Sequence, residues 1–104
     1  MTLLLEKEQK FSHMLALLIL HAEQLGYKVT MGYVYRCEDC TEGKTDSLHK
    51  KHLAADLNLF TDDVYLTKTQ DHKLLGKYWE SIGGTWGGRW GDGNHYSLEH
   101  EGMK

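Results

Sequence analysis

The sequence lacks the features that would direct the chain to a membrane or to nucleic acid. No segment of the 104 residues approaches the roughly 20 consecutive apolar residues that a membrane span requires. The opening MTLLLEKEQK has no basic segment before its short apolar run, so no signal peptide is predicted. The formal net charge is −3, and no basic face for phosphate binding is evident. We therefore expect synthesis in the cytoplasm, no stable membrane association and no nucleic-acid partner.

Proline is absent and cysteine is scarce. Cys37 and Cys40 form a lone CEDC, and the second CxxC that a four-cysteine zinc site needs does not occur. A redox pair should open a helix after a strand, whereas CEDCTEGKTD is predicted to be a loop whose acids disfavour a thiolate. We interpret the two residues as reduced loop cysteines, with a disulfide or a second metal site as the alternatives.

Hydrophobic periodicity predicts two helices. Over residues 5–25, apolar residues recur at steps of three and four on one face, which consists of Phe11, Leu15, Leu18, Ala22 and Leu25. A second helix is predicted within residues 67–84, with Thr67 and Gln70 as a capping box and the pair Gly83-Gly84 as its end. Its apolar face consists of Leu74, Leu75, Tyr78, Trp79 and Ile82.

Period-two alternation predicts a small antiparallel sheet. The predicted strands are residues 27–36, 52–60, 64–66 and 95–100. In the second strand one face consists of Leu53, Ala55, Leu57 and Leu59, and the other of Ala54, Asp56 and Asn58. Residues 61–63 are predicted to form a turn, and the glycine-rich residues 85–94 to lack regular structure. The order helix, strands, helix, strand and the short length predict a single α+β domain.

Asp56 is the first candidate site residue, because it interrupts a strand that otherwise has a buried character. Burying an unpaired charge costs several kcal/mol, so the carboxylate needs a lysine partner, contact with solvent or a metal ion. His49 precedes it by seven residues at a loop–strand junction, and His95 opens the last strand. Two histidines and a carboxylate leave a fourth position open, which is the composition of a catalytic zinc site. Seven histidines make chance spacings easy, so spacing alone does not select the metal.

Asp92 lies three residues before His95 in GDGNH. A carboxylate in that position could act as the base that hydrolysis of an amide requires. The alternative is that Asp92 caps a turn, as aspartate often does beside glycine.

Two motifs together resemble a known family. SLHKKHLAAD resembles the Ser-x-His-x-x-Gly-x-Ala-x-Asp motif of the zinc D-alanyl-D-alanine carboxypeptidase and L-alanyl-D-glutamate endopeptidase family, and GDGNH resembles its Asp/Glu-x-x-His motif. The resemblance implies a zinc site on the sheet with His49, Asp56 and His95 as ligands of one ion and Asp92 as the catalytic base. His52 stands where the family has glycine, and we interpret it as strand surface rather than as a ligand.

The resemblance also implies residues that contact substrate. Arg36 matches the arginine that faces the substrate carbonyl or carboxylate, with a surface ion pair as the alternative. Ser47 matches the motif serine and is expected to support the site by hydrogen bonding. Trp90 is expected to wall the cleft, and Trp86 either to do the same or to pack in the core. The other histidines are expected on the surface or in the core; they are His13, His21, His72 and His100.

The chain looks most like the compact bacteriophage and prophage members of this family. That likeness implies a monomeric zinc peptidase that cuts the stem peptides of peptidoglycan at L-Ala–D-Glu and serves as a lysin. Without a signal peptide, it would reach the cell wall through a holin-type membrane lesion or from the virion. The alternatives are a D-Ala–D-Ala carboxypeptidase or dipeptidase, and a non-catalytic zinc-binding recognition domain.

Overall fold

The computed structural model describes residues 3–32, 53–100 and 102. These residues form helices and a small open antiparallel sheet, which confirms the α+β class predicted from the sequence. In chain order the elements are α1 (Leu3–Gln24), β1 (Lys28–Met31), β2 (Ala54–Thr61), β3 (Val64–Leu66), the 3-10 helix η2 (Thr69–His72), α2 (Lys73–Ser81), β4 (Thr85–Trp86), the 3-10 helix η3 (Gly87–Trp90) and β5 (His95–Ser97).

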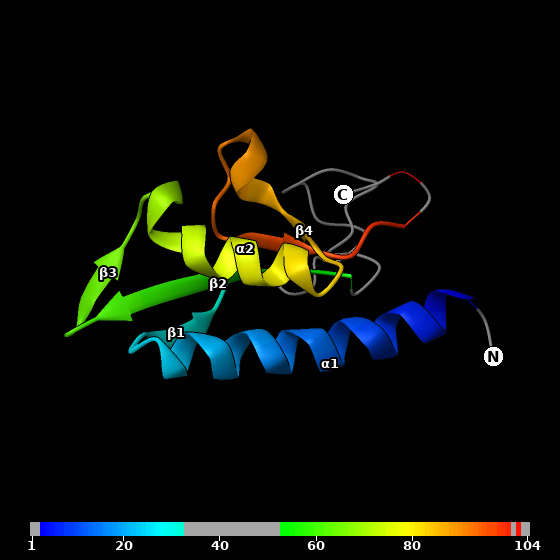
Figure 1. Cartoon of the computed structure of the whole chain (residues 1–104), viewed down its shortest axis with the longest axis horizontal. Coiled ribbons are helices and arrows are strands. Elements are labelled where there is room, and N and C mark those ends of the chain that lie inside the picture. The colour runs from blue at the N-terminus through cyan, green and yellow to red at the C-terminus, as the bar shows by residue number, and fades with distance from the viewer. Residues whose placement is uncertain (1–2, 33–52, 101, 103–104) are drawn as a thin grey trace, which may run out of the picture.

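The long strand β2 is the centre of the sheet (Figure 1). Its second half pairs with β1 and β3, its first half pairs with β5, and β4 lies beyond β5. Asp62 and Asp63 join β2 to β3 with positive φ angles of 50° and 63°. This is the conformation of a two-residue hairpin turn, which aspartate tolerates better than most residues. The turn and the return strand predicted over residues 61–66 are therefore confirmed.

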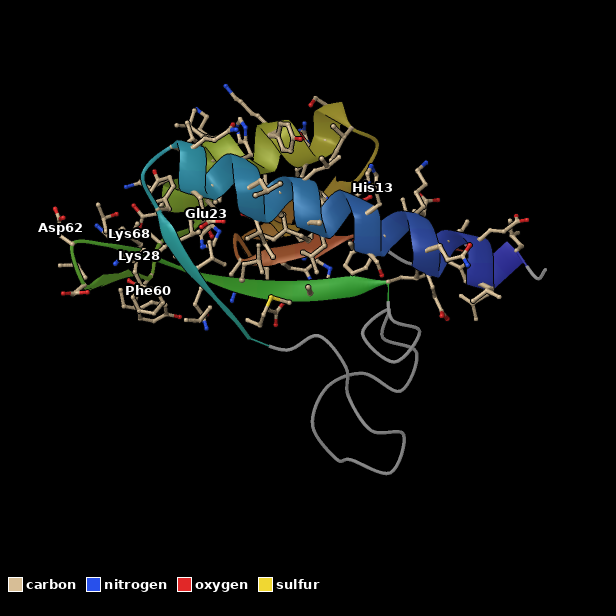
Figure 2. All side chains as sticks on the ribbon, turned by 90° about the horizontal axis from the view of Figure 1, so that it is seen from below. His13, Glu23, Lys28, Phe60, Asp62 and Lys68 are labelled. Atoms are coloured by element: carbon tan, nitrogen blue, oxygen red, sulfur yellow. The ribbon has the colours of Figure 1, made fainter. Side chains whose placement is uncertain are left out.

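Both α-helices cover the same face of the sheet (Figure 2). The predicted face of β2 is confirmed, since Leu53, Ala55, Leu57 and Leu59 are fully buried. Burial alternates only from Ala55 onward, because Ala54 on the other face is fully buried as well. Trp79 of α2 closes this core, with edge-to-face contacts to Phe11 and Tyr96 at centroid distances of 5.7 and 5.9 Å. Its indole N–H donates to Ser97 O at 2.8 Å, so the buried polar atom is satisfied.

The start of the second helix differs from the prediction. The predicted capping pair of Thr67 and Gln70 is wrong, because the N–H of Lys68 donates to the carboxylate of Asp71 at 3.0 Å. The turn η2 follows, and α2 begins only at Lys73. Leu74 is also wrongly placed on the apolar face, since 57% of it is exposed.

Packing against the core and against β4 decides which side of α2 is buried. Leu75 and Trp79 lie four residues apart on one side of the helix and are fully buried. Gly76 lies on the same side, and a Cβ there would collide with the ring of Trp86. The helix thus uses a glycine to approach β4, which leaves Leu74 facing solvent.

The structure differs from the prediction in two further places, the end of α1 and the glycine-rich segment before β5. In α1 the predicted Leu25 is 42% exposed, and Met14 is buried in the core instead. The glycine-rich residues 85–94 are not irregular throughout, because they include β4 and η3. In the described part of the chain, no helix has the length and apolar character needed to cross a membrane. Of the strand predicted over residues 27–36, the part beyond residue 32 lies outside the described residues.

Candidate metal centre

Asp56 and His95 lie directly opposite each other on paired strands. The register of β2 and β5 aligns them, and the Oδ1 atom of Asp56 is 3.5 Å from the Nδ1 atom of His95. Both side chains are largely shielded from solvent, with 15% and 11% exposed. Alternation places Asp56 on the face of β2 opposite the helices, so its carboxylate avoids the apolar core. Among the residues that the structure describes, His95 is the basic side chain that faces this carboxylate.

This pair has the donor chemistry and the separation that zinc requires. Histidine nitrogen and carboxylate oxygen are ordinary zinc ligands at about 2.0–2.2 Å. Two such atoms at a tetrahedral angle are about 3.4 Å apart by that geometry, close to the 3.5 Å between Oδ1 and Nδ1. The same separation is longer than a usual N–H···O hydrogen bond. Asp56 and His95 therefore fit as two ligands of one ion.

The third predicted ligand, His49, lies outside the described residues. Within the described ranges, no group of three or more His, Cys, Asp or Glu side chains is arranged to hold a metal. Five further residues discussed from the sequence also lie outside those ranges; they are Arg36, Cys37, Cys40, Ser47 and His52. The roles given to all of these residues stay predictions.

Asp92 lies in the turn that leads into β5. Its carbonyl accepts from the N–H of His95 at 3.2 Å, and its own N–H donates to Gly87 O at 2.9 Å. The turn is thus held by the main chain of Asp92, and the residue itself is exposed. An exposed carboxylate-bearing residue therefore lies in the turn directly before the candidate ligand His95, and its role as a base stays a prediction.

The two tryptophans differ in their surroundings. The ring of Trp90 lies 5.8 Å from that of His95 at an angle of 55°, and half of the residue is exposed. It therefore forms a wall beside the candidate ligand. Trp86 is half-buried, its ring packs closely on Gly76 and Gly88, and its indole N–H donates to Gly93 O at 2.7 Å. Trp86 supports the loop that carries Asp92.

A buried polar pair lies behind the candidate ligands. His72 Nδ1 and the Tyr96 hydroxyl share a hydrogen bond of 2.7 Å, and both residues are buried. Burial lowers the pKa of His72 to about 4, against the opposing effect of the Asp71 carboxylate. Burial also raises the pKa of Tyr96. Sequence reasoning placed His72 only as surface or core, although its spacing from Leu75 indicated the buried side.

Sequence reasoning also missed Thr69, which lies against the Asp92 turn. Its hydroxyl donates to Gly91 O at 3.1 Å and accepts from the N–H of Gly93 at 3.2 Å. Beside it a polar cavity of about 160 Å³ is lined by residues of two segments, 65–72 and 91–94, among them Asp92. A threonine at the start of a helix gives no sequence signal for contacts this distant. The remaining histidines have ordinary settings: His13 is exposed, His21 stacks on Tyr78 at 4.1 Å, and His100 is buried.

Comparison with known proteins identifies the family to which this chain belongs. A family model described as D-alanyl-D-alanine carboxypeptidase matches residues 41–98, which is more than half of the chain. The matched segment contains all three predicted ligands and Asp92. No curated protein matches the chain significantly. With more than half of its length matched, the chain belongs to the D-alanyl-D-alanine carboxypeptidase family of peptidases.

Proposed function

We propose that this chain is a zinc-dependent peptidase that hydrolyses the L-Ala–D-Glu bond of peptidoglycan stem peptides and acts as a phage or prophage lysin. The observation that carries the proposal is the pairing of Asp56 with His95 across β2 and β5, one turn after Asp92. Membership of a peptidase family supports the same reading. The scissile bond and the lytic role rest on the likeness to compact phage members.

In this proposal a few residues carry the metal-binding and catalytic roles. Asp56 and His95 hold zinc together with His49, and zinc bound there supplies Lewis acidity that polarises a carbonyl group and lowers the pKa of water. Asp92 accepts a proton from the attacking water and returns it to the leaving amine. Arg36 donates to the oxygen on which negative charge develops.

The surroundings of the site favour a peptide substrate. Trp90 offers an exposed aromatic surface beside His95, against which a short peptide can pack. In this proposal Ser47 also contacts the substrate. The partner is the stem peptide of peptidoglycan and the active form is a monomer, which a holin-type lesion or the virion delivers to the wall.

A second candidate is a D-Ala–D-Ala carboxypeptidase, which the description of the matching family favours directly. It uses the same metal pair and base and differs in the part of the site that reads a free carboxylate. A non-catalytic recognition domain is less well supported, because a purely structural zinc site needs no exposed acid beside it.

Digestion of purified Gram-negative sacculi with zinc-loaded protein tests the proposal. Mass spectrometry of the fragments should show new L-Ala carboxyl termini. Release of terminal D-Ala would instead assign the carboxypeptidase activity to this chain. An absence of any product would refute both peptidase activities.

Asp92→Asn tests the role of the base. Because general acid–base catalysis contributes roughly 10²–10⁴-fold, turnover should fall by about that factor while zinc content and thermal stability stay unchanged. Asp63→Asn is the matched control, since this exposed turn residue has a positive φ angle that asparagine also adopts. Normal turnover in Asp92→Asn would contradict the mechanism.

A further inference from the structure

One side chain connects the backbone on both sides of Asp92. The hydroxyl of Thr69 donates to Gly91 O at 3.1 Å and accepts from the N–H of Gly93 at 3.2 Å. Thr69 is the first residue of η2 and lies far from this loop in the sequence. A single hydroxyl thus bonds to the residue before Asp92 and to the residue after it.

The two segments are also in close steric contact. A Cβ atom on Gly93 would lie 2.5 Å from Thr69 Cα and 2.9 Å from Thr69 O, so only glycine permits this approach. On the other side, the indole N–H of Trp86 donates to Gly93 O at 2.7 Å. Gly93 is therefore held by η2 through its N–H and by β4 through its carbonyl.

The start of η2 does not account for these contacts. The helix start is stabilised by Asp71, whose carboxylate accepts from the N–H of Lys68 at 3.0 Å. The hydroxyl of Thr69 instead turns toward the loop of residues 91–93. The N–H of Asp92 donates to Gly87 O, and its carbonyl accepts from the N–H of His95. These bonds fix the main chain of Asp92 and do not involve its carboxylate.

We propose that Thr69 is a positioning residue, which clamps the main chain around Asp92 and keeps its carboxylate within reach of the proton it transfers. The inference rests on the proposed function, in which Asp92 is the base. A misplacement of about 1 Å at a reacting group can lower a rate by roughly 100-fold. Loss of the clamp should therefore reduce turnover while zinc binding and substrate affinity persist.

Three threonine variants test the clamp. Thr69→Val keeps the shape and removes the hydroxyl, Thr69→Ser restores the hydroxyl, and Thr61→Val is a control at an exposed threonine of β2. All are compared in the zinc-loaded protein on a soluble peptidoglycan fragment, for whichever stem-peptide bond the wild-type protein cleaves. The measurements are kcat, KM, bound zinc, and hydrogen exchange of the Gly93 amide by NMR.

We expect Thr69→Val to lower kcat by on the order of 10- to 100-fold with little change in KM or bound zinc. Its Gly93 amide should exchange faster, and Thr69→Ser should recover most of both properties. Wild-type kcat in Thr69→Val overturns the inference. A loss of folding or zinc in Thr69→Val that Thr69→Ser fails to restore also overturns it, since it shows a structural role.

Asp92→Asn separates this inference from the proposed function. If Asp92→Asn is inactive and Thr69→Val is fully active, the positioning role of Thr69 is refuted and the proposed peptidase function stands. Full activity in Asp92→Asn, or no cleavage by the wild-type protein, overturns both.

Discussion

The buried His72 should make the stability of this protein depend on pH. It is 3% exposed, shares a hydrogen bond of 2.7 Å with the Tyr96 hydroxyl, and has its pKa lowered by burial to about 4. In the unfolded chain the same imidazole has a pKa near 6.5. Between these two values the unfolded state binds more protons than the folded state. Acidification therefore favours unfolding, and the stability that neutral His72 maintains above pH 6.5 is lost as the pH falls toward 4.

The size of the effect follows from the two pKa values. One pKa unit corresponds to 1.36 kcal/mol, so the complete loss amounts to about 3 kcal/mol. Between pH 7.5 and pH 5 the expected loss is about 2 kcal/mol. For a domain of this size, that change lowers the melting temperature by about 10 °C. His72 is almost wholly buried, so solvent does little to screen the effect.

The contribution of His72 to the pH dependence of stability can be measured by urea denaturation. The wild-type protein and His72→Asn are compared at pH 7.5 and pH 5. Asparagine keeps a polar partner near the Tyr96 hydroxyl but does not titrate. The loss of unfolding free energy on acidification should be about 2 kcal/mol smaller in His72→Asn. His13→Asn is the control, because His13 is an exposed histidine on α1 (Figure 2) and should leave the wild-type pH dependence unchanged. An equal loss in wild type and His72→Asn would refute the reasoning.

Three further predictions concern packing and zinc. Leu75→Ala should cost about 2–4 kcal/mol of unfolding free energy, whereas Leu74→Ala should cost less than about 1 kcal/mol; comparable costs in urea titrations would contradict the helix face described above. Gly76→Ala should push the Trp86 ring aside, cost about 1–3 kcal/mol and shift the tryptophan fluorescence, and an unchanged spectrum would speak against the contact. Zinc at about 100 times its Kd should stabilise the protein by about 2.7 kcal/mol in calorimetry, and a chelator should reverse this; no shift in melting temperature would exclude zinc as a ligand of the folded chain.

The parts of the fold that follow from side-chain periodicity were predictable. The alternation in β2 gave the buried face, and the two aspartates before β3 gave the hairpin turn. The start of α2 was wrongly predicted, because Thr67 and Gln70 fit the capping pattern, whereas the bond from Lys68 N–H to the Asp71 carboxylate forms one residue later and a 3-10 turn precedes the helix. Leu74 was misplaced because the contact of Gly76 with Trp86, which is distant in the sequence, sets the side of α2 that is buried.

The candidate site was predictable in part. Each residue of the Asp56–His95 pair was recognised as a possible ligand, and each was placed on a strand from its local pattern. Their pairing depends on the register of strands far apart in the sequence, which local patterns do not specify. The contacts of Thr69 were missed because they depend on a glycine with no room for a side chain.

In the proposed site, the register of β2 against β5 would link metal binding to completion of the sheet. Asp56 stands between Ala55 and Leu57, both fully buried, so a shift by one residue would bring the carboxylate into the core and expose its neighbours. The two candidate ligands, Asp56 and His95, come together only when the late strand β5 docks on β2 in this one alignment. Zinc affinity should therefore report the fraction of molecules with a correctly paired sheet, and the metal would select that alignment over any slipped one during folding.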